Sequence, residues 1–191
     1  VHAPGGQSVR VRSLHAQNRA ADHGTAGQRV ALNLAGIERQ DITRGDWIGD
    51  ARMLQSTTRL DARIRLLPDA PALAAWTPLH VHLGAARCQA HAVPLEGDTV
   101  LPGQETRLQL VFDTPVFVLP GDRMILRNAQ GTRTVGGGAV LDPRAPERRR
   151  RSAQRRTWLD AMDTLVATGD AHPLLAVAPA GLTRSQLTRW L

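Results

Sequence analysis

The sequence has no lysine, no tyrosine and only one cysteine. All 24 of its cations are therefore arginines, and a guanidinium makes forked contacts to phosphate and carboxylate that an ammonium group cannot make. The single thiol, Cys88, excludes a disulfide within the chain, which suits a reducing cytosol. No apolar run approaches the roughly 18 residues of a membrane span, and no basic segment followed by an apolar one indicates a signal peptide. We therefore expect a cytoplasmic protein with no membrane partner.

The positive charge is concentrated in one segment. Residues 144–156 hold seven arginines and one glutamate, which is +6 of the formal net charge of +7. The basic character is thus local rather than a field over the whole molecule. Arg148, Arg149, Arg150 and Arg151 are candidates for contact with RNA phosphates, in which case affinity should fall steeply with salt. The same run also fits a phosphate-binding helix start, a nuclear-type signal or a solvated linker.

Residues 57–142 show the repeated alternation of short β-strands. In the first segment Leu60, Ala62, Ile64 and Leu66 alternate with charged residues, which is typical of a half-buried strand. Alternating segments follow at 79–83, 87–95, 105–112, 123–127 and 133–141. Six or so strands at this spacing, separated by turn residues, predict a closed antiparallel β-barrel. Cys88 lies in one of these patterns, which predicts a half-buried, unreactive thiol.

The residues before this region carry a second set of strand patterns. Residues 8–15 alternate, and residues 30–35 predict a buried strand that ends at Gly36. Residues 37–42 predict one helical turn, and Arg44-Gly45-Asp46 predicts a chain reversal before Trp47. Residues 18–25 are predicted to be a polar loop, and residues 50–56 a linker.

The residues after the barrel change to a helical period. From 147 to 167 the apolar residues Trp158, Leu159, Met162 and Leu165 fall on one helix face. Gly169 predicts the end of that helix. Residues 172–178 can form a short helix, and Thr183 is a good N-cap for a last helix that runs to Leu191.

The order of these segments resembles the second and third domains of translational GTPases of the elongation factor Tu type. The motifs that carry the resemblance are LHAQN at 14–18, AGQR at 26–29, LPGDRMILR at 119–127 and GTRTVGGGAV at 131–140. Within that group they look like the bacterial selenocysteine-specific elongation factors (SelB), and LTRSQLTRWL at the end resembles the first helices of a winged-helix unit.

The resemblance implies a mainly β chain of two antiparallel barrels followed by an α-helical start of a winged-helix region. Residues 1–53 would be the C-terminal part of the domain II barrel, 57–142 the domain III barrel, and 143–191 a basic linker helix with the start of the winged helix. The GTPase domain is expected to lie outside these residues, because no GxxxxGKS/T phosphate loop occurs in the sequence. GTP and Mg²⁺ would therefore belong to the full-length parent.

The resemblance also implies partners and a task. These factors bind selenocysteyl-tRNA and deliver it to the ribosome at UGA codons, and their C-terminal domains bind the mRNA hairpin that marks those codons. Two alternatives stay open: a barrel module of another translational GTPase, or a non-catalytic module that docks RNA or protein. No Ser-His-Asp set or paired carboxylates indicate an enzyme active site in this chain.

In the family pattern an arginine at position 29 marks the aminoacyl pocket. A selenol is largely ionised at neutral pH, so a guanidinium there would favour selenocysteine over serine by a charge-assisted contact. Arg29 is the residue that matches, with Gln28 beside it and His15 as a possible flank. The alternatives are that Arg29 is a solvated strand-edge residue and that His15 is structural.

The family uses one end of the third-domain barrel to contact the T-stem of tRNA. Arg87, Arg127, Asn128 and Arg133 are the residues expected there, since arginine and asparagine suit the phosphates and 2′-hydroxyls of an A-form helix. The family favours a glutamate near position 128 and a glutamine near position 79, and the sequence departs from it at both, with leucine at 79.

Two further motifs have simpler explanations. His80 and His82 share a strand face and could begin a metal site, but no third ligand lies at a suitable spacing. Gly136, Gly137 and Gly138 precede a strand rather than a helix, so they predict a bulge or close barrel packing, not a phosphate loop.

Overall fold

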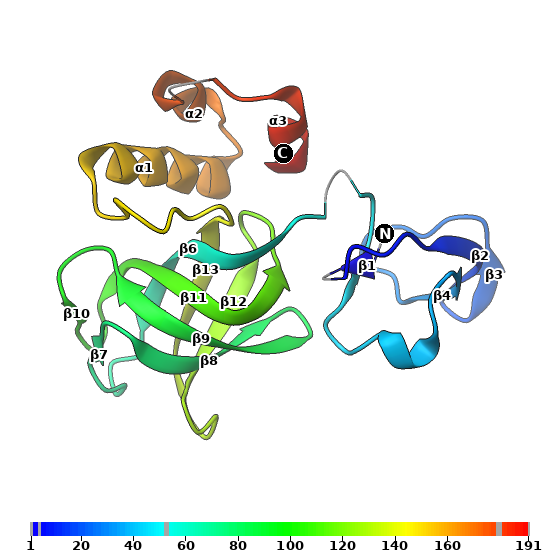
Figure 1. Ribbon diagram of the computed structural model, residues 1–191, viewed down its shortest axis with the longest axis horizontal. Coiled ribbons are helices and arrows are strands. Elements are labelled where there is room, and N and C mark those ends of the chain that lie inside the picture. The colour runs from blue at the N-terminus through cyan, green and yellow to red at the C-terminus, as the bar shows by residue number, and fades with distance from the viewer. Residues whose placement is uncertain (1, 4, 52–53, 179–180, 191) are drawn as a thin grey trace.

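The computed structural model describes residues 2–3, 5–51, 54–178 and 181–190 (Figure 1). Positions 52–53 of the predicted linker and Leu191 of the predicted last helix lie outside the described residues. β-Strand is the main secondary structure of the described chain, and three short helices follow the last strand. No helix among the described residues is both long enough and apolar enough to cross a membrane.

A closed barrel forms the centre of the molecule, as the alternation predicts. Its strands pair in the order β11-β6-β13-β12-β8-β9, and every pairing is antiparallel, including the one between β9 and β11 that closes the ring. The strands are β6 (Ser56–Leu66), β8 (Thr77–Leu83), β9 (Ala86–Pro94), β11 (Glu105–Phe117), β12 (Arg123–Asn128) and β13 (Thr134–Asp142). Two short strands, β7 (Leu73–Ala74) and β10 (Thr99–Val100), pair with each other beside it.

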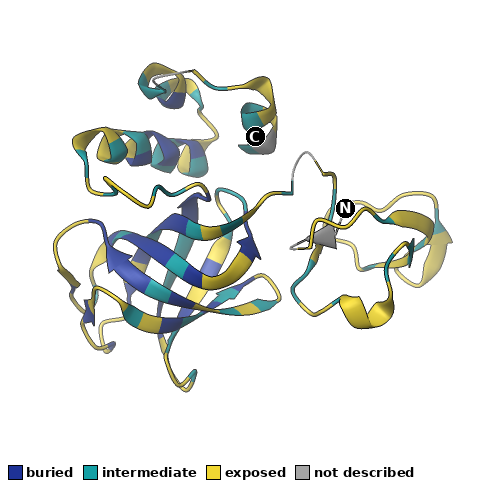
Figure 2. Cartoon of the chain, viewed as in Figure 1, coloured by how far each residue is buried: buried dark blue, intermediate teal, exposed yellow. Residues whose placement is uncertain are grey.

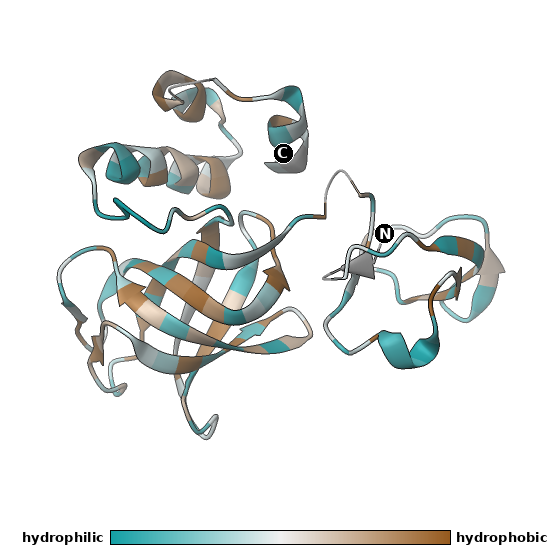
Figure 3. Ribbon diagram, in the orientation of Figure 1, coloured by the Kyte–Doolittle hydropathy of each residue, from teal (hydrophilic) through white to brown (hydrophobic). Residues whose placement is uncertain are grey.

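Apolar residues of the alternating segments form the core of the barrel. The barrel strands accordingly carry many residues coloured as buried in Figure 2 and as hydrophobic in Figure 3. Leu60, Ala62, Ile64 and Leu66 are all buried, and the strands around the ring contribute residues of the same kind. Cys88 is half-buried against this core, and burial raises the pKa of its thiol, as expected for an unreactive cysteine.

The glycine run lies within β13, where the barrel packs closely. A Cβ on Gly138 would lie 1.9 Å from the carbonyl oxygen of Arg63, and one on Gly136 would lie 2.5 Å from that of Arg65. Both distances are far inside van der Waals contact, so only glycine lets β13 approach β6 this closely. The prediction of close barrel packing at this run is confirmed.

The strand around Asp113 is longer than predicted. β11 continues through Asp113 to Phe117 instead of ending at Phe112, and its register with β6 shifts between Val111 and Val116. The residues between Val111 and Val116 thus form an irregularity within the strand, which does not end its pairing with β6.

The N-terminal residues form two small sheets next to the barrel. β2 (Arg10–Ala16) lies between β3 (Arg19–Ala21) and β4 (Val30–Ala35), while β1 (His2–Ala3) pairs with β5 (Trp47–Ile48). The prediction of a polar loop over residues 18–25 missed β3. The prediction of a buried strand at 30–35 was also wrong, since Leu32 is 38% exposed and Val30 and Leu34 are only half-buried. A single sheet layer cannot enclose both faces of a strand.

The segment between β4 and β5 follows the sequence prediction and leads to the barrel. A 3-10 turn, η1 (Arg39–Asp41), stands where one helical turn is expected. The reversal before Trp47 is closed by Asp46 N–H donating to the carbonyl of Thr43 at 3.1 Å, and Gly45 takes a φ of +105°. The Trp47 ring then packs against Phe117 of the barrel, with 4.9 Å between ring centroids.

Three helices follow the barrel, and the first starts later than its residue pattern predicts. α1 (Ala153–Thr168) begins after Ser152, whose hydroxyl accepts from Arg155 N–H at 3.2 Å, and it ends at Gly169 with a φ of +78°. The arginines at 148–151 therefore lie in the loop before α1. α2 (His172–Val177) and α3 (Arg184–Trp190) follow.

The predicted cap of the last helix is present. Gln186 N–H donates to the Thr183 hydroxyl at 3.2 Å, and the Gln186 side chain accepts from Thr183 N–H at 2.7 Å. This reciprocal pair is a capping box.

Candidate nucleic-acid interface

The outer surface of the barrel has two halves with different surroundings. Strands β6, β11 and β13 face α1, which lies directly over the barrel in Figure 1. Strands β8, β9 and β12 form the other half. The contacts made by outward-facing charges differ between the halves, and this difference locates the candidate site.

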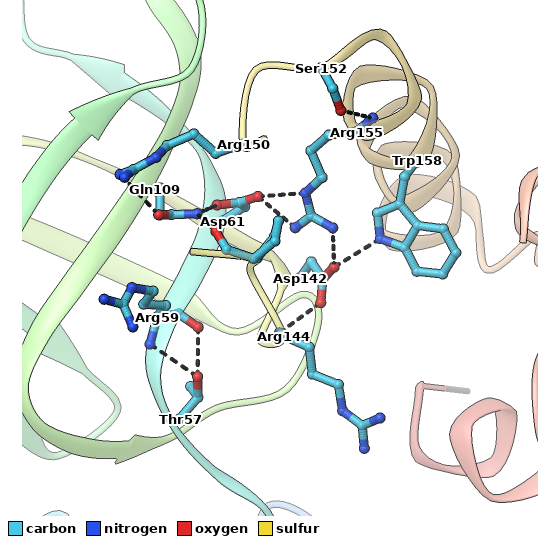
Figure 4. Close-up of polar contacts among 11 residues, drawn as sticks. Thr57, Arg59, Asp61, Gln109, Asp142, Arg144, Arg150, Ser152, Arg155 and Trp158 are labelled. Carbon is cyan, nitrogen blue, oxygen red and sulfur yellow. Dashed lines mark hydrogen bonds and ion pairs between the residues drawn. The ribbon is translucent and has the colours of Figure 1, made fainter. Parts of the chain in front are cut away.

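A buried ion network joins α1 to the first half (Figure 4). The guanidinium of Arg155 donates from Nε to Asp61 Oδ2 at 2.9 Å and from Nη1 to Asp142 Oδ2 at 2.7 Å. Asp61 on β6 is 0% exposed and Asp142 at the end of β13 is 2% exposed. One helix residue thus neutralises two carboxylates on neighbouring strands.

Neutral donors complete the network. Trp158 Nε1 donates to Asp142 Oδ2 at 2.8 Å, and Gln109 Nε2 donates to Asp61 Oδ1 at 3.0 Å. Burial raises the pKa of Asp61, while Arg155 and Gln109 act to lower it. Burial also acts to lower the pKa of Arg155, but Asp142 and Asp61 raise it overall, so the guanidinium stays charged.

A second group of ion pairs lies further along α1. Arg107 Nη2 on β11 lies 2.7 Å from both Asp160 and Asp163, and Arg63 Nη1 on β6 lies 3.0 Å from Asp163. The helix therefore supplies acids to barrel arginines here, and supplies an arginine to barrel acids at its start. The surface of this half is used for packing.

The four candidate linker arginines divide into two pairs. Arg151 donates to the carbonyl oxygen of Pro94 at 3.1 and 3.0 Å and pairs with Asp98 at 3.0 Å, while Arg150 Nη1 donates to Gln109 Oε1 at 3.3 Å. The side chains of Arg148 and Arg149 are exposed and make no hydrogen bond or ion pair with the described part of the chain. Only this second pair is available to a partner.

The second half of the barrel carries arginines without acidic partners among the described residues. The side chains of Arg87 on β9 and Arg127 on β12 have no acidic partner among the described residues. Strand register places His82 opposite Arg87 and His80 opposite Arg127, so the two imidazoles lie between the arginines on the outer face. Three buried polar atoms in this group have no hydrogen-bond partner in the described chain: His80 Nδ1, His82 Nε2 and Arg127 Nε. We call His80, His82, Arg87 and Arg127 the cationic face.

The imidazole of His82 has a lowered pKa because of its surroundings. Burial, followed by the charges of Arg127, Arg87 and His80, lowers the pKa of His82. His82 is therefore a neutral hydrogen-bonding group near neutral pH. From the sequence, His80 and His82 were considered only as the possible start of a metal site. Their period-two spacing next to outward arginines is the signal that would have placed them here.

The predicted T-stem residues lie around the hairpin between β12 and β13, but the side chains of two of them already have partners within the protein. Asn128 Oδ1 accepts from the backbone N–H groups of Thr132 at 2.9 Å and Arg133 at 3.0 Å, so this side chain shapes the hairpin loop. Arg133 Nη2 lies 2.7 Å from Asp69 Oδ2, and its hydrogen bond lowers the pKa of Asp69. Arg87 and Arg127 remain the members of the set that face outward without a carboxylate.

The predicted aminoacyl-pocket residues lie together on the N-terminal sheet. Arg29 directly precedes β4, and its Nη2 donates to Asn18 Oδ1 in the β2–β3 turn at 3.0 Å. The Gln28 side chain accepts from Thr25 N–H at 3.0 Å, and His15 lies on the adjacent strand, opposite Ala31. All three side chains are exposed. A cation thus stands at one end of this sheet, held by a neutral amide.

Replacing Arg155 with alanine should separate the helices from the barrel. The change leaves the carboxylates of Asp61 and Asp142 buried without their cation, and breaking such a group costs about 3–5 kcal/mol. Arg156→Ala is the matched control, because Arg156 is the exposed neighbour on the same helix and should change stability by less than about 0.5 kcal/mol. Urea unfolding followed by far-UV circular dichroism measures both, and equal effects would contradict the network's role.

Comparison with known proteins assigns the family. The family described as "Selenocysteine-specific elongation factor, beta-barrel domain" matches residues 58–147. The selenocysteine-specific elongation factor of Haemophilus influenzae is 34% identical over 155 residues, which cover 81% of this chain and 25% of the relative. The Escherichia coli protein of the same name is 34% identical over 164 residues, covering 85% and 25%.

The protein of that name from Desulfomicrobium baculatum is 31% identical over 189 residues, which cover 96% of this chain and 29% of the relative. The chain thus spans about a quarter of the length of the curated relatives it matches. The match of residues 58–147 falls on the closed barrel, whose strands run from β6 to β13. The chain therefore belongs to the selenocysteine-specific elongation factor family.

Proposed function

We propose that this chain is the tRNA-gripping part of a factor for selenocysteine incorporation. In this proposal the barrel holds selenocysteyl-tRNA while the whole protein delivers it to the ribosome at UGA codons. The names of the relatives support the process, since each is a selenocysteine-specific elongation factor. The observation that carries the RNA contact is the unequal surface of the barrel, with paired charges under α1 and unpaired arginines on the cationic face.

The chemistry of the cationic face suits a double-stranded RNA stem. A protein recognises an A-form helix through phosphates and 2′-hydroxyls across its shallow minor groove. Arg87 and Arg127 can contact phosphates, and the neutral imidazole of His82 can hydrogen-bond a hydroxyl. The partnerless nitrogens of His80, His82 and Arg127 would then gain the partners that the described chain does not give them.

Arg29 is proposed to distinguish selenocysteine from serine. Its only described side-chain partner is the neutral amide of Asn18, so its positive charge remains available to an anion. A selenolate would gain a charge-assisted contact there, whereas the neutral serine hydroxyl would not.

The tail is proposed to reach other RNA. Arg148 and Arg149 are the exposed pair of the linker, and they lie next to Trp158 and Val177 around a hollow of about 270 Å³. α3 with its capping box would be an early helix of a winged-helix unit. Contacts to ribosomal RNA or to the mRNA hairpin would continue in parts of the protein outside this chain.

The glycine run at 136–138 does not suit the phosphates of GTP. The glycine run is packed inside β13 against the backbone of β6 and opens no helix, so it offers no cradle for phosphates. GTP and Mg²⁺ are proposed to act in a GTPase domain outside this chain.

The double variant Arg87→Ala/Arg127→Ala should weaken binding of tRNA by tenfold or more at fixed salt. Each lost phosphate contact should also reduce the slope of log K against log salt by about one, so the slope should fall by about two. Filter binding of the whole protein over a salt series measures both quantities. Arg156→Ala removes one like charge from the far side of the barrel and should leave the slope almost unchanged. An unchanged slope in the double variant would contradict the proposal.

Arg29→Ala should lower the affinity for selenocysteyl-tRNA and leave that for seryl-tRNA nearly as it was. Loss of a hydrogen bond to a charged group should lower the affinity for selenocysteyl-tRNA roughly tenfold or more. The control is Arg19→Ala, which removes an exposed arginine from the same sheet. Competition between the two charged tRNAs for the whole protein gives the ratio of affinities. Equal losses for both tRNAs would exclude Arg29 as the selective group.

A further inference from the structure

Trp76 occupies a backbone conformation that a bulky residue rarely adopts. It lies in the turn between β7 and β8 with a φ of +63°, and 56% of it is exposed. Its backbone N–H donates to the carbonyl oxygen of Ala92 at 2.7 Å, which fixes the turn. Left-handed backbone costs free energy in a residue of this size, and a large exposed aromatic ring gains little from burial. Neither the fold nor the proposed T-stem contact explains a tryptophan here.

The Trp76 ring contacts His91, and His91 lines a polar hollow. The ring centroid of His91 is 5.9 Å from that of Trp76 at an interplanar angle of 55°, and His91 Nδ1 lies 3.7 Å from Asp113 Oδ1. The hollow has a volume of about 190 Å³, and His80, Gln89, His91 and Asp113 supply its polar groups. Through its contact with His91, the exposed Trp76 ring borders this group of amide, imidazole and carboxylate groups, and such an arrangement suits one planar base with hydrogen-bonding edges.

The hollow is continuous with the cationic face. Antiparallel register pairs His82 with Arg87, His80 with Gln89 and Pro78 with His91, and successive outward pairs lie about 7 Å apart. His80 belongs to both the hollow and the cationic face. From Arg87 to His91 the distance along β9 is therefore about 13 Å. RNA whose phosphates lie on Arg87 and Arg127 can thus place a nucleotide in the hollow.

We propose that this hollow binds one unpaired nucleotide of the RNA held on the cationic face. Trp76 stacks on the base, and the exposed amide of Gln89 hydrogen-bonds its edge. The inference rests on the proposed RNA contact and adds a second kind of recognition to it, because stacking needs a base outside the double helix. The polar lining and the neighbouring arginines favour a nucleotide over an apolar peptide.

Two RNA hairpins test the proposal on the whole protein at one salt concentration. They are identical except that one carries a single bulged nucleotide in its stem and the other is fully paired. The wild type should bind the bulged hairpin about tenfold more tightly, which is within the range for stacking one base on an aromatic side chain. Trp76→Gly should abolish that preference, and Trp76→Phe should keep most of it. Leu101→Ala, at another exposed apolar residue, is the control and should keep it fully.

Thermal unfolding separates binding from a structural role. Glycine adopts a φ of +63° without strain, so Trp76→Gly should unfold at the same temperature as the wild type or higher while losing the preference. Equal binding of both hairpins by the wild type, or a preference kept in Trp76→Gly, would overturn the inference and leave the proposed function intact. If Arg87→Ala/Arg127→Ala bound both hairpins like the wild type, the proposed function itself would fail.

Discussion

The arrangement of the molecule depends on the guanidinium of Arg155 between two buried carboxylates. Asp61 and Asp142 are almost fully removed from water, and an unpaired charge in that environment would be strongly destabilising. The planar fork of arginine reaches both acids at once, which the point charge of a lysine does not do as well. The pairing fixes the start of α1 on the barrel and thereby decides which half of the barrel is covered.

The two halves of the barrel differ in whether their outward arginines are paired with acids. Under α1 the arginines at positions 63 and 107 are matched by the acids at 160 and 163 of the helix. On β8, β9 and β12 the outward arginines have no such partners in the described chain, so their charge is available to phosphate. The same division runs through the linker, where Arg150 and Arg151 hold the loop against the barrel and Arg148 and Arg149 remain exposed.

The sequence predicted what depends on local period, and missed what depends on tertiary contact. Period-two alternation in Leu60, Ala62, Ile64 and Leu66 was sufficient to predict the barrel interior, and glycine in β13 to predict its tight packing. The helix after the barrel was predicted to start at 147. The four consecutive arginines show no apolar periodicity that could locate the start, and the Ser152 cap sets it instead. The exposure of Leu32 depends on having one sheet layer, which no local pattern records.

The candidate site was predictable only in part, for the same reason. Arg87 and Arg127 were expected from the family resemblance, but their lack of acidic partners became visible only when the strands were placed side by side. Asn128 was expected to face RNA, yet its amide closes its own hairpin loop. The left-handed backbone conformation of Trp76 could not be predicted from the sequence, because no neighbouring residue indicates a positive φ there.

Hydroxyl-radical footprinting of the whole protein, with and without tRNA, tests most directly the claim that the barrel binds RNA by its uncovered half. Bound tRNA should protect outward side chains of β8, β9 and β12, including His80 and Ile125, and leave the exposed side of α1 around Gln154 unchanged. Protection along that side of α1, with β8 and β12 as reactive as in the free protein, would contradict the account.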